Sequence, residues 1–262
     1  HPPLTTKWQA VEQDNGEFIF NTDGVKRAYN MGFKIVRLLD TWPTKYSIAD
    51  NKNEDTTWYS SYAPEDMAAW KKYVKETVRA YYPYIQHWEI WNEPNGIFLR
   101  VPKGVDKASV LPSIMTNIYK QTMDAVDELG LDVTLIGGAA TILADPFTSK
   151  IMDNGCNNYL DAVSFHYYRD DMSISDDPVC LNVYNKIKHF LNRKNLPIQI
   201  WQSEGGIGEL NRWIKTDKVP SPNNAGYLIP DMETAANTLV RTVVNFKAIG
   251  ITRTIHYMDN AH

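Results

Sequence analysis

The sequence has no long apolar stretch and no excess of positive charge, and each absence excludes a class of partner, whereas its small number of cysteines leaves two interpretations open. Its two cysteines, Cys156 and Cys180, form one disulfide if the chain is secreted, or remain as two free buried thiols. No apolar run is long enough to span a bilayer, so we expect no membrane partner. The net charge of −4 argues against a nucleic-acid partner that is bound through phosphate contacts.

Motifs for metals and phosphate-bearing cofactors are also missing. The six histidines show no metal-ligand spacing such as His-Glu-x-x-His. No glycine-rich phosphate loop follows any of the apolar runs that could form strands. We therefore expect neither a metal ion nor a cofactor.

Short apolar runs alternate with amphipathic segments along the whole chain. The runs predict six strands, at residues 33–39, 86–91, 133–138, 161–166, 198–203 and 251–257. Helical spacing predicts helices at about 23–31, from Pro64 to about 81, at 112–129, a short one from 145, and at 178–192 and 232–248. Strands that are apolar throughout are typical of parallel strands covered by helices. We interpret residues 1–262 as a single α/β domain.

Polar residues recur where these strands end, at Asp40, Asn92 and Glu93, His166 to Tyr168, Glu204 and Tyr257. In a TIM (β/α)8-type barrel the carboxyl ends of all the strands meet at one mouth. An open doubly wound sheet would not bring all of them together. The pattern therefore favours the barrel.

Two strand ends carry a glutamate behind a tryptophan. Pro94 cannot donate to a sheet, so it ends one strand just after Glu93. The second stretch, residues 200–206, places Trp201 inside a strand and Glu204 at its end. Two carboxyl groups on separate strands are the machinery of a glycosidase, about 5 to 5.5 Å apart in retaining enzymes and farther apart in inverting ones. Their sequence positions do not choose between these mechanisms.

The stretch Trp88-Glu89-Ile90-Trp91-Asn92-Glu93-Pro94-Asn95 resembles the acid/base signature of clan A glycoside hydrolases, which are retaining (β/α)8-barrel enzymes. Within that clan the chain is most similar to bacterial family 39 and family 5 enzymes. The resemblance implies that Glu93 is the acid/base and that Glu204 is the nucleophile. It further implies that Asn92, His166 and Tyr168 bind the sugar or position the nucleophile.

Further substrate-binding candidates come from the strand ends and loops. Asp40 either binds a sugar hydroxyl or merely ends its strand. Trp42 lies in a loop, where it could stack on a sugar ring, and Trp201 forms either core or the floor of the site. Tyr257 lies near the position where the clan usually has a tryptophan on its last strand.

The chain departs from the clan at both ends. Only about 20 residues precede the first predicted helix, whereas a strand-helix-strand unit needs roughly 30. The barrel is therefore expected to be incomplete at its N-terminal end and to lack the helix after the last strand. Either the chain is a fragment, or residues 1–20 supply makeshift strands, or another chain completes the barrel by self-association.

The predicted function is a retaining glycoside hydrolase that acts on a β-linked sugar or polysaccharide, and we expect it to be secreted. Its partner is a carbohydrate. A glycan-binding barrel remnant with weak or no activity is the first alternative, and a transglycosylase is the second.

Overall fold

The computed structural model describes residues 5–41, 43–49, 61–140, 146–167, 198–205 and 232–256, together with a few single positions of the segment 185–192. The chain forms two compact units, and their boundary falls within one strand. The first unit comprises residues 1–141 and 145–163, and the second comprises residues 142–144 and 164–262. The prediction of a single domain stays a prediction.

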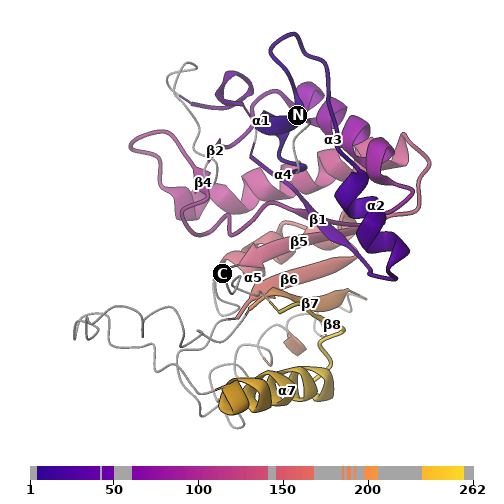
Figure 1. Ribbon diagram of the computed structural model, residues 1–262. Helices are drawn as coiled ribbons and strands as arrows, with labels where there is room; N and C mark the ends of the chain where they lie inside the picture. Colours follow the sequence, from indigo (N-terminus) through magenta and orange to yellow (C-terminus); the bar gives the residue numbers. More distant parts are fainter. Residues whose placement is uncertain are drawn as a thin grey trace, which may run out of the picture. The chain divides into compact units, whose positions relative to one another are not determined.

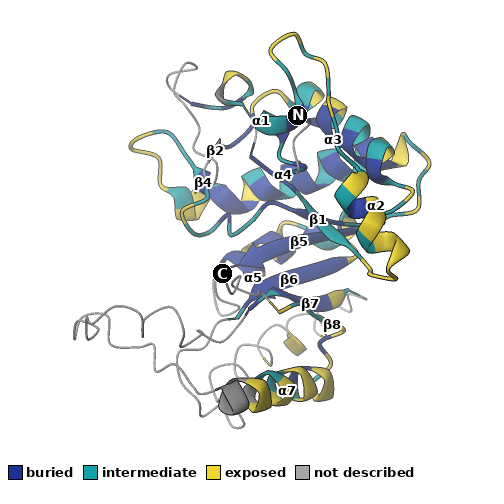
Figure 2. Ribbon diagram, viewed as in Figure 1, coloured by how far each residue is buried: buried dark blue, intermediate teal, exposed yellow. Residues whose placement is uncertain are grey.

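The first unit is built on three parallel strands, β1 (Val36–Leu39), β3 (His87–Ile90) and β5 (Thr134–Ala140). They pair in the order β1-β3-β5, with Leu38 opposite Glu89 and Glu89 opposite Ile136. The strand β6 (Ala162–His166) follows, and the backbone N–H of Asp161 donates to the carbonyl of Leu135. The strands β3 and β5 are buried along nearly their whole length, and Figure 2 shows β5 in the dark blue of buried residues. Burial on both faces explains why these strands are apolar throughout.

Two long helices, α3 (Met67–Tyr81) and α4 (Lys107–Asp127), pack side by side over these strands (Figure 1). The ring of Tyr81 on α3 meets Trp88 of β3 edge to face, with centroids 6.3 Å apart. On α4, the phenol oxygen of Tyr119 accepts the backbone N–H of Gly138 in β5 at 3.0 Å. The apolar stripe at helical spacing therefore faces the sheet, as the sequence predicts.

The start of α4 corrects the prediction, because the helix begins five residues before Pro112. The side chain of Asp106 caps it by accepting the backbone N–H of Ala108. Pro112 thus lies inside the helix, where it cannot donate to the carbonyl of Ala108. The ammonium group of Lys150, on α5 (Pro146–Asp153), lies 3.4 Å from that carbonyl and donates to it instead.

Smaller elements complete the first unit. They are α1 (Trp8–Val11), α2 (Asp23–Asn30), the 3-10 turns η1 (Thr44–Tyr46) and η2 (Cys156–Asn158), and the short strands β2 (Ser61–Tyr62) and β4 (Leu99–Arg100). The strands β2 and β4 form a separate parallel pair that the sequence did not predict. Cys156 is buried with a free thiol. Cys180 lies outside the described residues.

Residues 5–9 lie along the outer edge of β1. The hydroxyl of Thr6 donates to the carbonyl of Leu38 at 2.7 Å, and the backbone N–H of Trp8 donates to the carbonyl of Asp40 at 3.1 Å. The N–H of Gln9 continues the series to Thr41. Part of the N-terminal region therefore borders β1 as a strand would, although it turns into the helix α1 at once.

The second unit contains the remainder of β6, the strands β7 (Gln199–Glu204) and β8 (Arg253–Thr254), and the helix α7 (Met232–Ala248). Its strands pair in the order β6-β7-β8, and β7 and β8 are parallel with Trp201 opposite Arg253. Phe246 of α7 packs edge to face against Phe165 and Tyr167, with centroids 5.9 and 5.5 Å away.

All six predicted strands are present, within a few residues of their expected limits, and the described elements form the predicted α/β architecture with parallel pairing. Among the described residues, no helix has the length and apolarity that crossing a lipid bilayer requires.

Candidate active site

The stretch after β3 leaves strand geometry within a few residues. The N–H of Trp91 donates to the carbonyl of Leu39 at 3.0 Å, which extends the β1–β3 ladder by one residue. The backbone then turns, because Trp91 and Glu93 have φ angles of 68° and 39°, in the left-handed region that non-glycine residues avoid. Such residues cost of order 1–3 kcal/mol each and tend to cluster at functional sites.

The same backbone feature marks the neighbouring strand ends of the first unit. Thr41, just after β1, has a φ angle of 43°, and Ala139, near the end of β5, has one of 41°. Three adjacent strands therefore leave the sheet through strained residues at their carboxyl ends. This edge is the one on which the sequence places its polar candidates.

Glu93 and Asn92 are half-buried, between the buried side chains of Trp91 and Pro94. The carbonyl of Glu93 accepts the N–H of Gly96 at 2.9 Å, which closes a tight turn. Glu93 is thus fixed by its backbone while the residue stays partly exposed. A general acid/base has both requirements.

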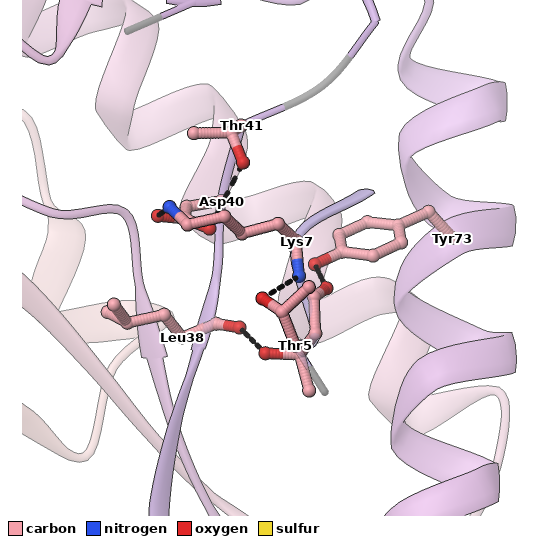
Figure 3. A network of polar contacts seen from close by, with 7 residues as sticks. Thr5, Lys7, Leu38, Asp40, Thr41 and Tyr73 are labelled. Atoms are coloured by element: carbon pink, nitrogen blue, oxygen red, sulfur yellow. Dashed lines mark hydrogen bonds and ion pairs between the residues drawn. The ribbon is translucent and has the colours of Figure 1, made fainter. Parts of the chain in front are cut away.

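Asp40 is buried at the end of β1 and forms an ion pair (Figure 3). The ammonium group of Lys7 contacts the carboxylate, with Nζ 2.9 Å from Oδ2. The hydroxyl of Thr41 lies 3.4 Å from Oδ1. Burial raises the pKa of Asp40, and the charge and hydrogen bond of Lys7 oppose that rise. The sequence gives no signal for Lys7, because its partner lies 33 residues away.

A second buried carboxylate, Glu12, supports this region. It accepts hydrogen bonds from the indole N–H of Trp8 and, at 2.6 Å, from the phenol of Tyr46. The ammonium group of Lys45 lies 3.7 Å from it. Burial, together with the hydrogen bond to Glu12, raises the pKa of Tyr46 to about 12.

In the second unit, Glu204 ends β7 next to His166, which ends β6. The Nδ1 atom of His166 lies 3.9 Å from Oε2 of Glu204, and the imidazole is buried. The N–H of Tyr167 donates to the carbonyl of Glu204 at 2.9 Å, so the two strand ends are joined by their backbones. The predicted neighbourhood of His166 and Glu204 is therefore present.

Gly205 makes this junction tight. A Cβ atom at this position would lie 2.2 Å from the carbonyl oxygen of Tyr167 and 2.1 Å from Nε2 of Gln202. The glycine after Glu204 is thus required by the close approach of the two strand ends.

The side chain of Trp201 contacts a different set of groups. Its indole N–H donates to the side chain of Gln199 at 3.0 Å, and the guanidinium of Arg253 lies 5.7 Å from its ring centroid. In a strand, positions 201 and 204 fall on opposite faces. These contacts give the ring a packing role, and its binding of sugar stays a prediction.

Of the remaining candidates, Tyr168, Trp42 and Tyr257 lie outside the described residues. Glu93, Asn92 and Asp40 belong to the first unit, and His166 and Glu204 belong to the second. In the first group the backbone ladder joins the two strand ends, and in the second the side chains of His166 and Glu204 lie 3.9 Å apart.

Comparison with known proteins identifies the fold. A family 39 glycoside hydrolase from Bacteroides cellulosilyticus WH2 matches with a TM-score of 0.64 and 17% identity, over 97% of this chain and 49% of that one. The chain has an α/β fold of the TIM-barrel type, incomplete in the part that the structure describes. A monomeric beta-xylosidase from Caulobacter crescentus CB15 matches with a TM-score of 0.58 and 15% identity, over 94% of this chain and 50% of that one. The endoglucanase Cel5A from Thermotoga maritima matches with a TM-score of 0.58 and 13% identity, over 97% of this chain and 76% of that one.

These likenesses confirm the predicted relation to the barrel folds of family 39 and family 5 glycosidases. The chain spans about half the length of the first two structures. No protein-family model matches the sequence, and no curated protein matches it either.

Proposed function

We propose that the protein is a retaining glycoside hydrolase that cleaves a β-linked sugar or polysaccharide. The observation that carries the proposal is that a glutamate lies at the carboxyl end of each of two strands, in a fold that solved glycoside hydrolases share. Glu93 follows β3 on a strained, fixed turn, and Glu204 ends β7 against a buried histidine. Both residues are half-buried, as groups that must meet a substrate need to be.

In this mechanism Glu204, as a carboxylate, attacks the anomeric carbon, and Glu93, in its protonated form, gives its proton to the leaving oxygen. The product of this step is a covalent glycosyl-enzyme. Water then attacks the same carbon, Glu93 takes the proton from the water, and Glu204 is released. The two inversions together retain the configuration of the sugar. The chemistry requires no cofactor.

The neighbouring residues have supporting roles in the proposal. Asn92 donates a hydrogen bond to the 2-hydroxyl of the sugar, a contact that strengthens in the transition state. His166 lines the sugar site beside Glu204. Tyr168 lies outside the described residues, and the resemblance to the clan assigns it the role of holding the carboxylate of Glu204.

Two alanine variants and a panel of aryl β-glycosides test the assignment. Glu204→Ala should lose nearly all turnover because the nucleophile is gone, and Glu93→Ala should lose most of it because water attacks the glycosyl-enzyme only slowly without the base. An aryl leaving group is activated, so the glycosyl-enzyme still forms in Glu93→Ala. Azide should revive them with opposite stereochemistry. In Glu93→Ala it attacks the glycosyl-enzyme and gives the β-azide, whereas in Glu204→Ala it takes the place of the nucleophile and gives the α-azide.

A control variant, Glu76→Gln, changes an exposed glutamate of α3 that pairs with Arg79 and should keep wild-type turnover. Wild-type rates in Glu204→Ala would refute the mechanism. Sugar binding without turnover in the wild-type protein would instead support a glycan-binding remnant. A sugar-transfer product in place of the hydrolysed one would identify a transglycosylase. Secretion and self-association stay predictions, which cell fractionation and sedimentation would measure.

A further inference from the structure

The pair of Lys7 and Asp40 has no role in the mechanism above, yet it lies beside the strand end that carries Glu93. Asp40 directly follows β1, and Trp91 directly follows β3, its neighbour in the sheet. The N–H of Trp91 donates to the carbonyl of Leu39, so the ladder is intact up to this level. Neighbouring strands lie about 4.8 Å apart, so the backbone of Asp40 lies beside that of Trp91, two residues before Glu93.

The two members of the pair differ in their access to solvent. The side chain of Asp40 is 2% exposed, whereas that of Lys7 is 16% exposed. Asp40 is therefore covered, and Lys7 is the more exposed member of the pair. A lysine ammonium is a donor only, so its ligand must offer an acceptor oxygen.

Anchors on both sides fix the backbone of Lys7. The carbonyl of Thr6 accepts the phenol of Tyr73 at 2.6 Å, and the hydroxyl of Thr6 is bonded to Leu38. The next residue, Trp8, is fully buried between the rings of Tyr46 and Tyr73, stacked at 5.0 and 5.1 Å. A donor that is held in this way loses little conformational entropy when a ligand binds.

We propose that Lys7 binds substrate, by donating a hydrogen bond from Nζ to a hydroxyl oxygen of the sugar that lies next to Glu93. Asp40 is then a positioning residue, which aims the ammonium group and offsets its charge. The inference rests on the proposed function for the identity of the ligand as a sugar.

The charge of the pair selects a neutral sugar. The carboxylate of Asp40 lies 2.9 Å from the ammonium and cancels its positive charge for any group that approaches Nζ. A uronate carboxylate would meet Lys7 and Asp40 together, and repulsion from Asp40 would offset the attraction to Lys7. A hydroxyl oxygen accepts the hydrogen bond without that repulsion.

Binding measurements, which need no turnover, test the inference. NMR titrations first compare four ligands on the full chain, the methyl β-glycosides of glucose, xylose, mannose and glucuronic acid. The neutral sugar that binds best is then compared with its 3-, 4- and 6-deoxy forms. Removing the hydroxyl that Lys7 contacts should weaken binding to the wild-type protein about 10- to 100-fold. In Lys7→Met, the parent sugar and this deoxy sugar should bind equally, within about threefold. The ratio compares two ligands on one protein sample, so partial unfolding of the variant does not change it.

Lys45→Met is the matched control, because Lys45 is a lysine of the same unit that pairs with Glu12. It should keep the wild-type ratio, and Lys7→Arg, which keeps a cationic donor, should recover part of it. A wild-type ratio in Lys7→Met overturns the inference even if the protein hydrolyses glycosides. If the glucuronide binds more tightly than the neutral glycosides, and if Lys7→Met abolishes this preference, then Lys7 binds a carboxylate and not a hydroxyl. If Lys7→Met removes the difference in affinity between the parent and deoxy sugars but the wild-type protein shows no turnover, the inference is supported and the proposed hydrolase is refuted. Binding of none of these sugars refutes both.

Discussion

The phenol oxygen of Tyr119 accepts the backbone N–H of Gly138 at 3.0 Å, and the same ring covers the preceding residue, Gly137. A single side chain of α4 thus satisfies a buried donor of β5 and fills the space above it. The contact holds the longest helix of the first unit against its central strands, one residue before the strained Ala139.

Gly137→Ala should therefore destabilise the protein. The new Cβ atom would lie 2.7 Å from Cδ1 of Leu160 and 2.8 Å from Cε1 of Tyr119. Overpacking of this kind costs about 1–3 kcal/mol of unfolding free energy, which urea denaturation measures. Gly24→Ala on α2 is the control, because its nearest neighbour lies at 3.8 Å, and it should gain about 0.5–1 kcal/mol through helix propensity. Equal stability of the two variants would show that the space over β5 is not filled.

Gly205→Ala should affect activity more than stability. The added Cβ atom would meet the backbone of Tyr167, which the hydrogen bond to Glu204 holds in place, so the strand end that carries Glu204 must move. A shift of about 1 Å costs on the order of 100-fold in rate. The measurement is kcat/KM on the best aryl β-glycoside.

The neighbouring variant Ser203→Ala is its control. The hydroxyl of Ser203 is buried, and within the described part of the chain no hydrogen-bond partner meets it. Its removal should leave kcat/KM near the wild-type value. If Gly205→Ala retains full activity, the position of Glu204 does not depend on this close approach.

Glu128 should make the stability of the protein fall at acidic pH. It follows α4 and pairs with Lys71 and Lys75 of α3, and their hydrogen bonds lower its pKa to about 2. A lowered folded-state pKa means that the stabilisation is present above the unfolded value of about 4.5 and is lost as the pH falls toward 2. The urea midpoint of the wild-type protein should drop more steeply over this range than that of Glu128→Gln. The double variant Lys71→Met/Lys75→Met should show the same shallow dependence on pH. A wild-type slope in this variant would show that the two lysines do not cause the acid sensitivity.

Cys156 should resist thiol reagents in the native protein. Burial raises the pKa of its thiol to about 12, so the reactive thiolate is scarce at neutral pH. An Ellman-type assay should show slow reaction of this thiol in buffer and complete reaction in denaturant. Mass mapping assigns the signal to Cys156 and separates it from Cys180. Rapid labelling of Cys156 in the native state would contradict its burial.

Local sequence patterns predict the strands well and the ends of elements less well. The strands around Ile90, Ile136 and Phe165 are apolar on both faces, so their runs show in the sequence. The start of α4 was missed because Pro112 looked like a first-turn residue, while Asp106 supplied the real cap. The strands β2 and β4 are two residues each, too short to leave a pattern.

The candidate site shows the same division. Glu93 and Glu204 stand out because a tryptophan precedes and a chain-breaking residue follows each of them, which are local signals. Lys7 could not be found, because its importance arises from pairing with the distant Asp40. Left-handed residues are most often glycine, asparagine or aspartate, so nothing in the sequence marks Trp91 as one.

The hydrogen bonds of residues 5–9 with β1 also bear on aggregation. An exposed strand edge is a template on which another chain can add. Thr6 and Trp8 engage the outward carbonyls of Leu38 and Asp40, so this part of the edge is already paired. A second chain that added here would first have to displace the buried ring of Trp8. Residues 5–9 therefore block the addition of a second chain along this part of the β1 edge.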